Sequence, residues 1–177
     1  MPADVWHRLN GQPRIDTSWL YPPFLVRLRI ALARSQERGA DYYPTCGWRS
    51  FEEQAKRHAA YKAGTGTRAA PEGLSPHQYG AAADLAPDGD LKKPGLQADY
   101  RLKNYAILVE EVRRVGLVSG VSFNDAPHVQ IPRFVAGRDL RRLRTVYRSA
   151  KGTTERERLD AVWAYLDSLP LFPSQVA

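Results

Sequence analysis

The sequence contains a single cysteine, Cys46, among 177 residues. One thiol excludes an internal disulfide, and it excludes any zinc ribbon or finger that is built on paired thiolates. The apolar and aromatic neighbours of Cys46 favour a small buried side chain over a nucleophile. The sequence also lacks an apolar run of about 18 residues, the length that a membrane span requires. Its first residues lack the basic segment and apolar core of a signal peptide. We therefore expect a soluble cytoplasmic product, which would reach a target outside the cytoplasm only if something else released it.

Acidic residues are outnumbered by basic ones, with 19 Asp and Glu against 26 Lys and Arg and a formal net charge of +7. Such a surface attracts polyanions of several kinds, including nucleic acids, anionic lipids and cell-wall polymers. Because no zinc-finger spacing, RNP-type aromatic run or basic zipper is present, we do not expect a nucleic-acid partner. The five arginines of RDLRRLRTVYR, residues 138–148, either form a solvated helix face or contact anionic envelope polymers.

The length suits one domain, and we treat residues 1–177 as a single unit without a separate wall-binding domain, expected to be a monomer. Apolar periodicity and capping signals predict helices over 24–39, 50–64, 98–116 and, as a C-terminal pair, within 136–169. Short β-rich stretches predict strands within 41–48, 80–87, 117–123 and 128–131. This pattern is typical of an α+β fold, in which helices pack on a small, mostly antiparallel sheet.

The stretch LSPHQYGAAADLAP, residues 74–87, holds two metal-binding side chains seven residues apart, His77 and Asp84. In a strand, alternate side chains share a face, so Asp84 should face away from the core that receives Ala83 and Leu85. Gly80 permits the preceding turn to approach closely.

A second stretch, NDAPHVQI, places His128 and Gln130 on one face of a strand. Asp125 precedes His128 by three residues, which in a plain strand would place the two side chains on opposite faces. Pro127 constrains Ala126 to an extended conformation, and a turn there could bring Asp125 back beside His128.

Two histidines and one aspartate form a suitable catalytic zinc set, with water in the fourth position. The bound water becomes a nucleophile, and a carboxylate that does not bind the metal must take its proton; Asp125 suits that role. The alternative is structural: His77 caps a turn, Asp84 accepts from backbone N–H groups, and His128 is a satisfied strand histidine.

The segment CGWRSFEEQ begins the second predicted helix, with Ser50 as N-cap and Glu53 completing a capping box. Arg49 and Gln54 flank that cap in positions that approach each other, as in the hydrophobic staple. Arg49 could then contact an oxyanion or a substrate carboxylate. The alternative is a surface ion pair with a neighbouring glutamate.

Together these stretches resemble the LAS zinc peptidases, which include D-alanyl-D-alanine carboxypeptidases and phage L-alanyl-D-glutamate endopeptidases. SPHQYGAAADL is similar to the family's Ser-x-His-x-x-Gly-x-Ala-x-Asp motif at every fixed position, namely Ser75, His77, Gly80, Ala82 and Asp84. DAPHVQ resembles the second motif, an acidic residue three before a histidine, and GWRSFEEQ resembles the Arg-Ser-x-x-x-Gln segment. The three motifs occur in the family's order within a core of residues 47–130.

The resemblance implies a zinc ion (Zn2+) at the sheet face, bound by His77, Asp84 and His128. It implies Asp125 as general base and acid, and Arg49 as the oxyanion or carboxylate contact. Gln54 and Ser75 would support or touch substrate, although an ordinary turn role suits Ser75 equally. Many carboxypeptidases of the family have Glu and Trp before the final His, whereas this chain has Asp125 and Pro127, as in the endolysin and endopeptidase branch.

We therefore predict a zinc metallopeptidase, a bacteriolytic phage endolysin-like hydrolase that degrades the peptidoglycan of the cell wall. The expected activity is that of an L-alanyl-D-glutamate endopeptidase. One alternative is a D-Ala-D-Ala carboxypeptidase or dipeptidase, which would use the same chemistry on a smaller substrate. An alternative of another class is a non-catalytic zinc-binding module.

Overall fold

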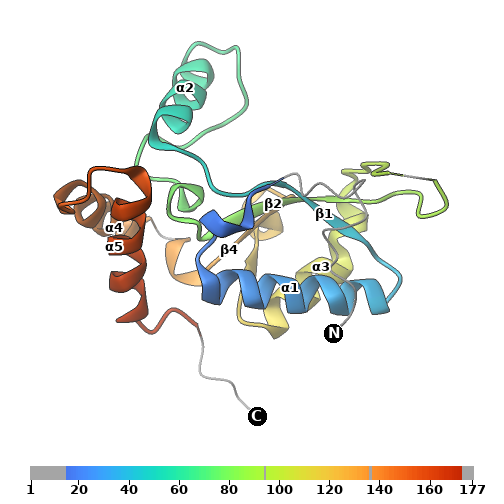
Figure 1. Ribbon diagram of the computed structural model, residues 1–177. Coiled ribbons are helices and arrows are strands. Elements are labelled where there is room, and N and C mark those ends of the chain that lie inside the picture. Colours follow the sequence, from blue (N-terminus) through green and yellow to red (C-terminus); the bar gives the residue numbers. More distant parts are fainter. Residues whose placement is uncertain (1–14, 94, 136, 173–177) are drawn as a thin grey trace.

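The structure, a computed structural model, describes residues 15–93, 95–135 and 137–172 (Figure 1). Within these residues it has five α-helices and four strands, joined by short 3₁₀ turns. In chain order the elements are α1 (Pro22–Glu37), β1 (Tyr42–Cys46), α2 (Phe51–Lys62), β2 (Ala82–Pro87), α3 (Ala106–Arg114), β3 (Val118–Ser119), β4 (His128–Gln130), α4 (Arg138–Ser149) and α5 (Glu155–Asp167).

The described strands form one sheet in the order β1-β2-β4-β3, and every pairing in it is antiparallel. The predicted α+β fold with a small antiparallel sheet is therefore confirmed. Strand β2 lies in the middle, between the strand that precedes it and the strand that contains His128. This position gives β2 backbone partners on both sides.

The two faces of the sheet have different partners. Ala83, Leu85 and Val129 are completely buried in the hydrophobic core, which also receives side chains from α1 and α3. Figure 1 shows α1 and α3 side by side beneath the sheet. Asp84 and His128 occupy the alternate positions, so they face the opposite side, as the period of two requires. The core thus fixes which face of the sheet holds the polar residues.

Local sequence signals explain where three helices begin. Pro22 is the first residue of α1, where a missing N–H group costs nothing. The Ser50 side chain accepts a hydrogen bond from the backbone N–H of Glu53 and caps α2. Thr154 and Glu157 form a full capping box at the start of α5.

Two predicted elements are shorter in the structure. The helix expected over 98–116 contains nine α-helical residues, preceded by the 3₁₀ turn Leu102–Tyr105. Leu102 fits the apolar period of the predicted helix, but it lies in this 3₁₀ turn and is 62% exposed. The strand expected over 117–123 ends after Ser119, because the chain then turns to bring residue 125 towards β4.

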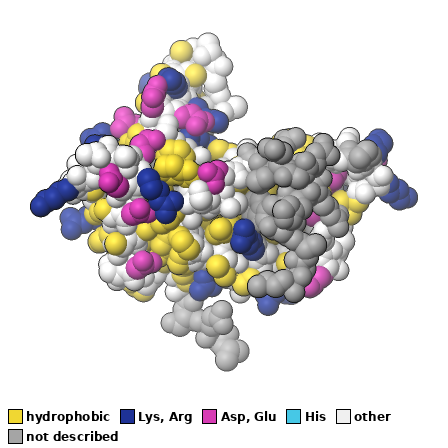
Figure 2. Space-filling view, in the orientation of Figure 1, with side chains coloured by type: hydrophobic (Ala, Val, Ile, Leu, Met, Phe, Trp, Pro, Cys, Tyr) yellow, Lys and Arg dark blue, Asp and Glu magenta, His cyan; other side chains and the backbone are white. Residues whose placement is uncertain are grey.

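Helix α2 projects away from the rest of the molecule, while α4 and α5 pack against each other on one side (Figure 1). The predicted C-terminal pair of helices is present; residue 136, where that prediction began, lies outside the described residues. Basic and acidic side chains are interspersed on the face in Figure 2. No helix in the described part of the chain combines the length and apolar character that a membrane crossing demands.

Candidate metal centre

The centre is built on one row of side chains across the sheet. Cys46 of β1 pairs with Asp84 of β2, and Asp84 pairs with His128 of β4. A register shift between Pro44 and Cys46 brings Cys46 opposite Asp84. Side chains at paired positions lie on the same face, so the sheet itself brings the carboxylate and one imidazole together.

His77 reaches this row from the 3₁₀ turn Pro76–Tyr79, which precedes β2. The turn ends at Gly80, whose φ of 67° lies in the left-handed region. A Cβ atom at Gly80 would lie 2.3 Å from the carbonyl oxygen of Trp19. A side chain at Gly80 would therefore clash with the backbone of residues 19–21, so glycine permits this segment to pass close to the turn.

Three potential ligand atoms converge at nearly equal distances. His77 Nε2 lies 3.2 Å from Asp84 Oδ1, and His128 Nδ1 lies 3.1 Å from the same oxygen. The two imidazole nitrogens are 3.2 Å apart. The histidines are almost fully buried, whereas the Asp84 side chain is 25% exposed. The structure thus assembles the three residues that the sequence offered as metal ligands.

The remaining ring nitrogens show which tautomers the histidines adopt. His77 Nδ1 lies 2.7 Å from the carbonyl oxygen of Gly47, which can only accept, so Nδ1 holds the proton. His128 Nε2 lies 2.7 Å from Oε1 of Gln130, so with this amide orientation Nε2 is the protonated nitrogen. When each ring is neutral, its other nitrogen therefore directs a lone pair towards the carboxylate oxygen of Asp84.

This arrangement fits a zinc ion. A tetrahedral zinc with bonds of about 2.0–2.1 Å to nitrogen and oxygen keeps its ligands about 3.3–3.4 Å apart. The three observed separations, 3.1–3.2 Å, are close to that value. Three lone pairs this close repel one another unless a proton or a metal cation lies between them.

The electrostatics of the centre favour positive charge in the same place. Burial disfavours a charged imidazole at His77, but the Asp84 carboxylate outweighs burial and raises the pKa of His77 to about 10. Burial also opposes ionisation of Asp84, yet His77 and His128 lower its pKa well below the usual range. The carboxylate is therefore ionised at neutral pH and available to a cation.

The turn before β4 places Asp125 beside the centre. His128 donates its backbone N–H to the Asp125 carbonyl oxygen at 3.0 Å, and Asp125 donates its own to Gly120 at 2.9 Å. Asn124 adopts a φ of 61°, which allows the sharp turn. The Asp125 side chain is exposed, lines the same cleft as the ligands and makes no hydrogen bond within the described part of the chain. The turn anticipated from Pro127 is thus present.

Arg49 and Gln54 contact each other as their flanking positions predicted. Arg49 Nη1 donates to Gln54 Oε1 at 2.7 Å, and Gln54 Nε2 donates to the Ala70 carbonyl oxygen at 2.6 Å. Arg49 Nη2 lies 3.1 Å from Cys46 Sγ and 3.9 Å from Asp84 Oδ2. The alternative partner, Glu53, lies 3.9 Å from Arg49 Nε, the same separation as that between Arg49 and Asp84. Arg49 is therefore held at the edge of the centre and is 7% exposed.

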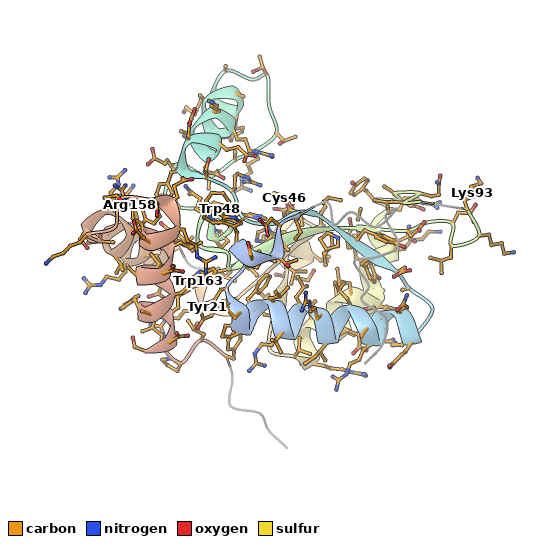
Figure 3. All side chains as sticks on the ribbon, in the orientation of Figure 1. Tyr21, Cys46, Trp48, Lys93, Arg158 and Trp163 are labelled. Carbon is orange, nitrogen blue, oxygen red and sulfur yellow. The ribbon has the colours of Figure 1, made fainter. Side chains whose placement is uncertain are left out.

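Our expectation for Cys46 was wrong. The thiol is only partly buried and lies near His77 and Arg49, because the register shift in β1 directs it to the polar face. Burial raises the pKa of this thiol, but His77 and Arg49 outweigh burial and lower it. Figure 3 shows Cys46 and Trp48 between the end of β1 and the base of α2.

Cys46 also offers a second grouping of donor atoms, since donors of Cys46, His77 and Asp84 lie within 4.8 Å of one another. We favour the group with His128 because its separations are shorter and close to those of tetrahedral zinc. Moreover, Cys46 Sγ is already in contact with Arg49.

The ligands lie in a cleft of about 700 Å³. One wall comes from α2 and the segment that follows it, including Arg57 and Arg68, and the other is more apolar, with Phe123 and Val135. Ser75 also lines the cleft and is 5% exposed, but its hydroxyl makes no hydrogen bond within the described part of the chain. A cleft of this size lies within the usual range of ligand-binding pockets.

The fold is similar in part to three solved structures. One is the L-Ala D-Glu endopeptidase ChiX of Serratia marcescens, with 22% identity and a TM-score of 0.48 over 64% of this chain and 81% of that one. Another is the vancomycin-resistance D,D-pentapeptidase VanY of a VanB-type cassette, in a complex with Zn(II), with 22% identity and a TM-score of 0.45 over 78% and 81%. The third is VanYB with D-alanine-D-alanine, with 21% identity and a TM-score of 0.44 over 79% and 80%.

No family model matches the sequence, and no curated protein matches it. At the identities and TM-scores above, the likeness is one of partial fold. The assignment of a metal centre therefore depends on the geometry of this chain's own side chains.

Proposed function

We propose that this protein is a zinc-dependent peptidase that hydrolyses the stem peptide of bacterial peptidoglycan, in the manner of a phage endolysin. The observation that supports it is the convergence of His77 Nε2, Asp84 Oδ1 and His128 Nδ1 within 3.2 Å of one another. Two imidazoles and one carboxylate leave a fourth position open, which is the arrangement of catalytic rather than structural zinc sites.

A zinc ion held by these three residues would supply Lewis-acid chemistry and lower the pKa of a bound water to about 7. Asp125 accepts the proton of the attacking water and transfers it to the leaving amine, because its carboxylate is exposed in the cleft. Arg49, beside the outer oxygen of Asp84, places positive charge where the scissile carbonyl oxygen becomes negative.

The expected bond is that between L-alanine and D-glutamate. This assignment is supported by the Asp-x-Pro-His sequence of residues 125–128 and by a cleft with room for several peptide residues. A carboxypeptidase or dipeptidase would need Arg49 to bind a terminal carboxylate. Both terminal nitrogens of Arg49 already contact Gln54 and Cys46, which favours internal cleavage. In the endolysin interpretation, the protein accumulates in the host cytoplasm and reaches the wall after release.

Mass spectrometry of the fragments released from purified peptidoglycan by the zinc-loaded protein tests this proposal. We expect stem peptides with a new N-terminal D-glutamate, and none from Asp125→Ala, which should still bind zinc. Asp160→Ala is the matched control, because Asp160 is an exposed aspartate on α5 that pairs with Arg156 outside the cleft. Released D-alanine would instead indicate a carboxypeptidase. The absence of fragments from a folded, zinc-loaded protein would refute the peptidase assignment and favour a zinc-binding module.

A further inference from the structure

Gln130 is a buried amide that contacts the metal ligand His128. It lies on β4 two residues after His128, so both side chains point to the same face of the sheet. Gln130 is 4% exposed, and its Oε1 lies 2.7 Å from His128 Nε2. This short contact fixes both the orientation of the ring and the nitrogen that holds its proton.

The orientation of this amide decides what His128 can bind. When Oε1 faces the ring, Nε2 must donate, and Nδ1 keeps a lone pair directed towards Asp84 and His77. When the NH2 group faces the ring instead, Nε2 must accept and Nδ1 carries the proton. That proton would then be donated to the Asp84 carboxylate, in the place that a metal ion would otherwise occupy.

The orientation seen in the structure has an energetic cost. Gln130 Nε2 is buried and has no hydrogen-bond partner among the described residues. An unsatisfied buried donor is costly in the folded state. The opposite orientation would give this NH2 group an acceptor on His128, yet the structure has the orientation that leaves the Nδ1 lone pair free. With Oε1 towards His128, the amide leaves the Nδ1 lone pair available to a cation at the centre.

We propose that Gln130 is a positioning residue that keeps His128 protonated on Nε2 and thereby sets the zinc affinity of the centre. The inference rests on the proposed zinc site. It goes beyond that site because it assigns the affinity to a side chain that does not touch the metal. Partners of this kind typically change metal affinity by about 10- to 100-fold when they are removed.

The test measures the zinc dissociation constant of the purified full chain by competition with a chromophoric chelator. Gln130→Leu removes the acceptor, and we expect its zinc affinity to fall by about 10- to 100-fold. Gln130→Glu keeps an oxygen that can only accept, so its affinity should equal or exceed that of the wild type. Circular dichroism of the metal-free proteins reports whether each variant is folded.

Gln78→Leu is the matched control. Gln78 is also fully buried, its Oε1 accepts one hydrogen bond, from Gly73 N–H at 2.7 Å, and its Nε2 is unpartnered among the described residues. Its side chain makes no hydrogen bond to either imidazole. We expect Gln78→Leu to lower the melting temperature while leaving the zinc affinity within about twofold of wild type.

A proton NMR spectrum of the zinc-loaded proteins gives a signature that a purely structural role would not produce. The Nε2–H proton of His128 should be hydrogen-bonded, downfield and slow to exchange in the wild type and in Gln130→Glu, and lost in Gln130→Leu. Equal zinc affinity in the wild type and Gln130→Leu would overturn the inference and leave the zinc site intact. A wild-type protein that binds no zinc would overturn both.

Discussion

Gly120→Ala is the substitution that tests how strictly the turn before β4 positions the catalytic groups. A Cβ atom at this position would lie 2.0 Å from the carbonyl oxygen of Asp125 and 2.8 Å from His128 Cβ, whereas real Cβ atoms stay at least 3.0 Å from such neighbours. The turn must therefore move by at least about 1 Å. Overpacking of this kind costs about 1–3 kcal/mol of stability. A displacement of about 1 Å in a catalytic group costs about 100-fold in rate.

Thermal unfolding and initial rates of peptidoglycan hydrolysis measure the two effects separately. Gly39→Ala is the control: Gly39 has a φ of 81° and open space around its Cβ position, so alanine strains only the backbone, by about 1–2 kcal/mol. Gly39 follows α1 and does not line the cleft. We expect both variants to lose stability and only Gly120→Ala to lose activity. Wild-type turnover by a folded Gly120→Ala protein would refute the argument.

Three further predictions concern the core, the caps and the cleft. Leu108→Ala should lower the free energy of unfolding in urea by about 2–5 kcal/mol, because Leu108 is completely buried. Glu157→Gln should destabilise α5 at neutral pH. Hydrogen bonds from Thr154 lower the pKa of Glu157 to about 2, so the ionised carboxylate stabilises the folded protein fully above the unfolded pKa of about 4.5. The difference in melting temperature between wild type and Glu157→Gln should therefore disappear as the pH falls from 4.5 to 2. Arg49→Lys should reduce kcat/KM at least about tenfold with zinc affinity retained, because lysine cannot contact Gln54 and Cys46 together.

Much of the fold follows from local signals in the sequence. Proline at position 22, the Ser50 cap and the Thr154–Glu157 box act within a few residues, so they could be identified without tertiary contacts. The alternation of Ala83, Asp84 and Leu85 likewise predicts which side chain leaves the core. The approach of His77 and Asp84 follows because the small residues between them permit a close turn.

Other features depend on tertiary contacts that no local pattern encodes. The register shift in β1 that turns Cys46 to the polar face is set by pairing with β2, a strand some 40 residues away in the sequence. Leu102 matches the helical period, yet the 3₁₀ turn at that point exposes it. The sequence places Gln130 on the same strand face as His128, but the role of Gln130 depends on the orientation of its side-chain amide. The steric importance of Gly120 follows from the path of the turn.

The most direct test of the zinc centre is X-ray absorption spectroscopy of the zinc-loaded protein. Coordination by His77, Asp84 and His128 predicts a first shell of nitrogen and oxygen alone, at about 2.0–2.1 Å, with the outer-shell scattering of two imidazoles. The spectrum should be unchanged in Cys46→Ser. A zinc–sulfur distance of about 2.3 Å that disappears in Cys46→Ser would instead place the metal on the Cys46 grouping and contradict the proposed catalytic site.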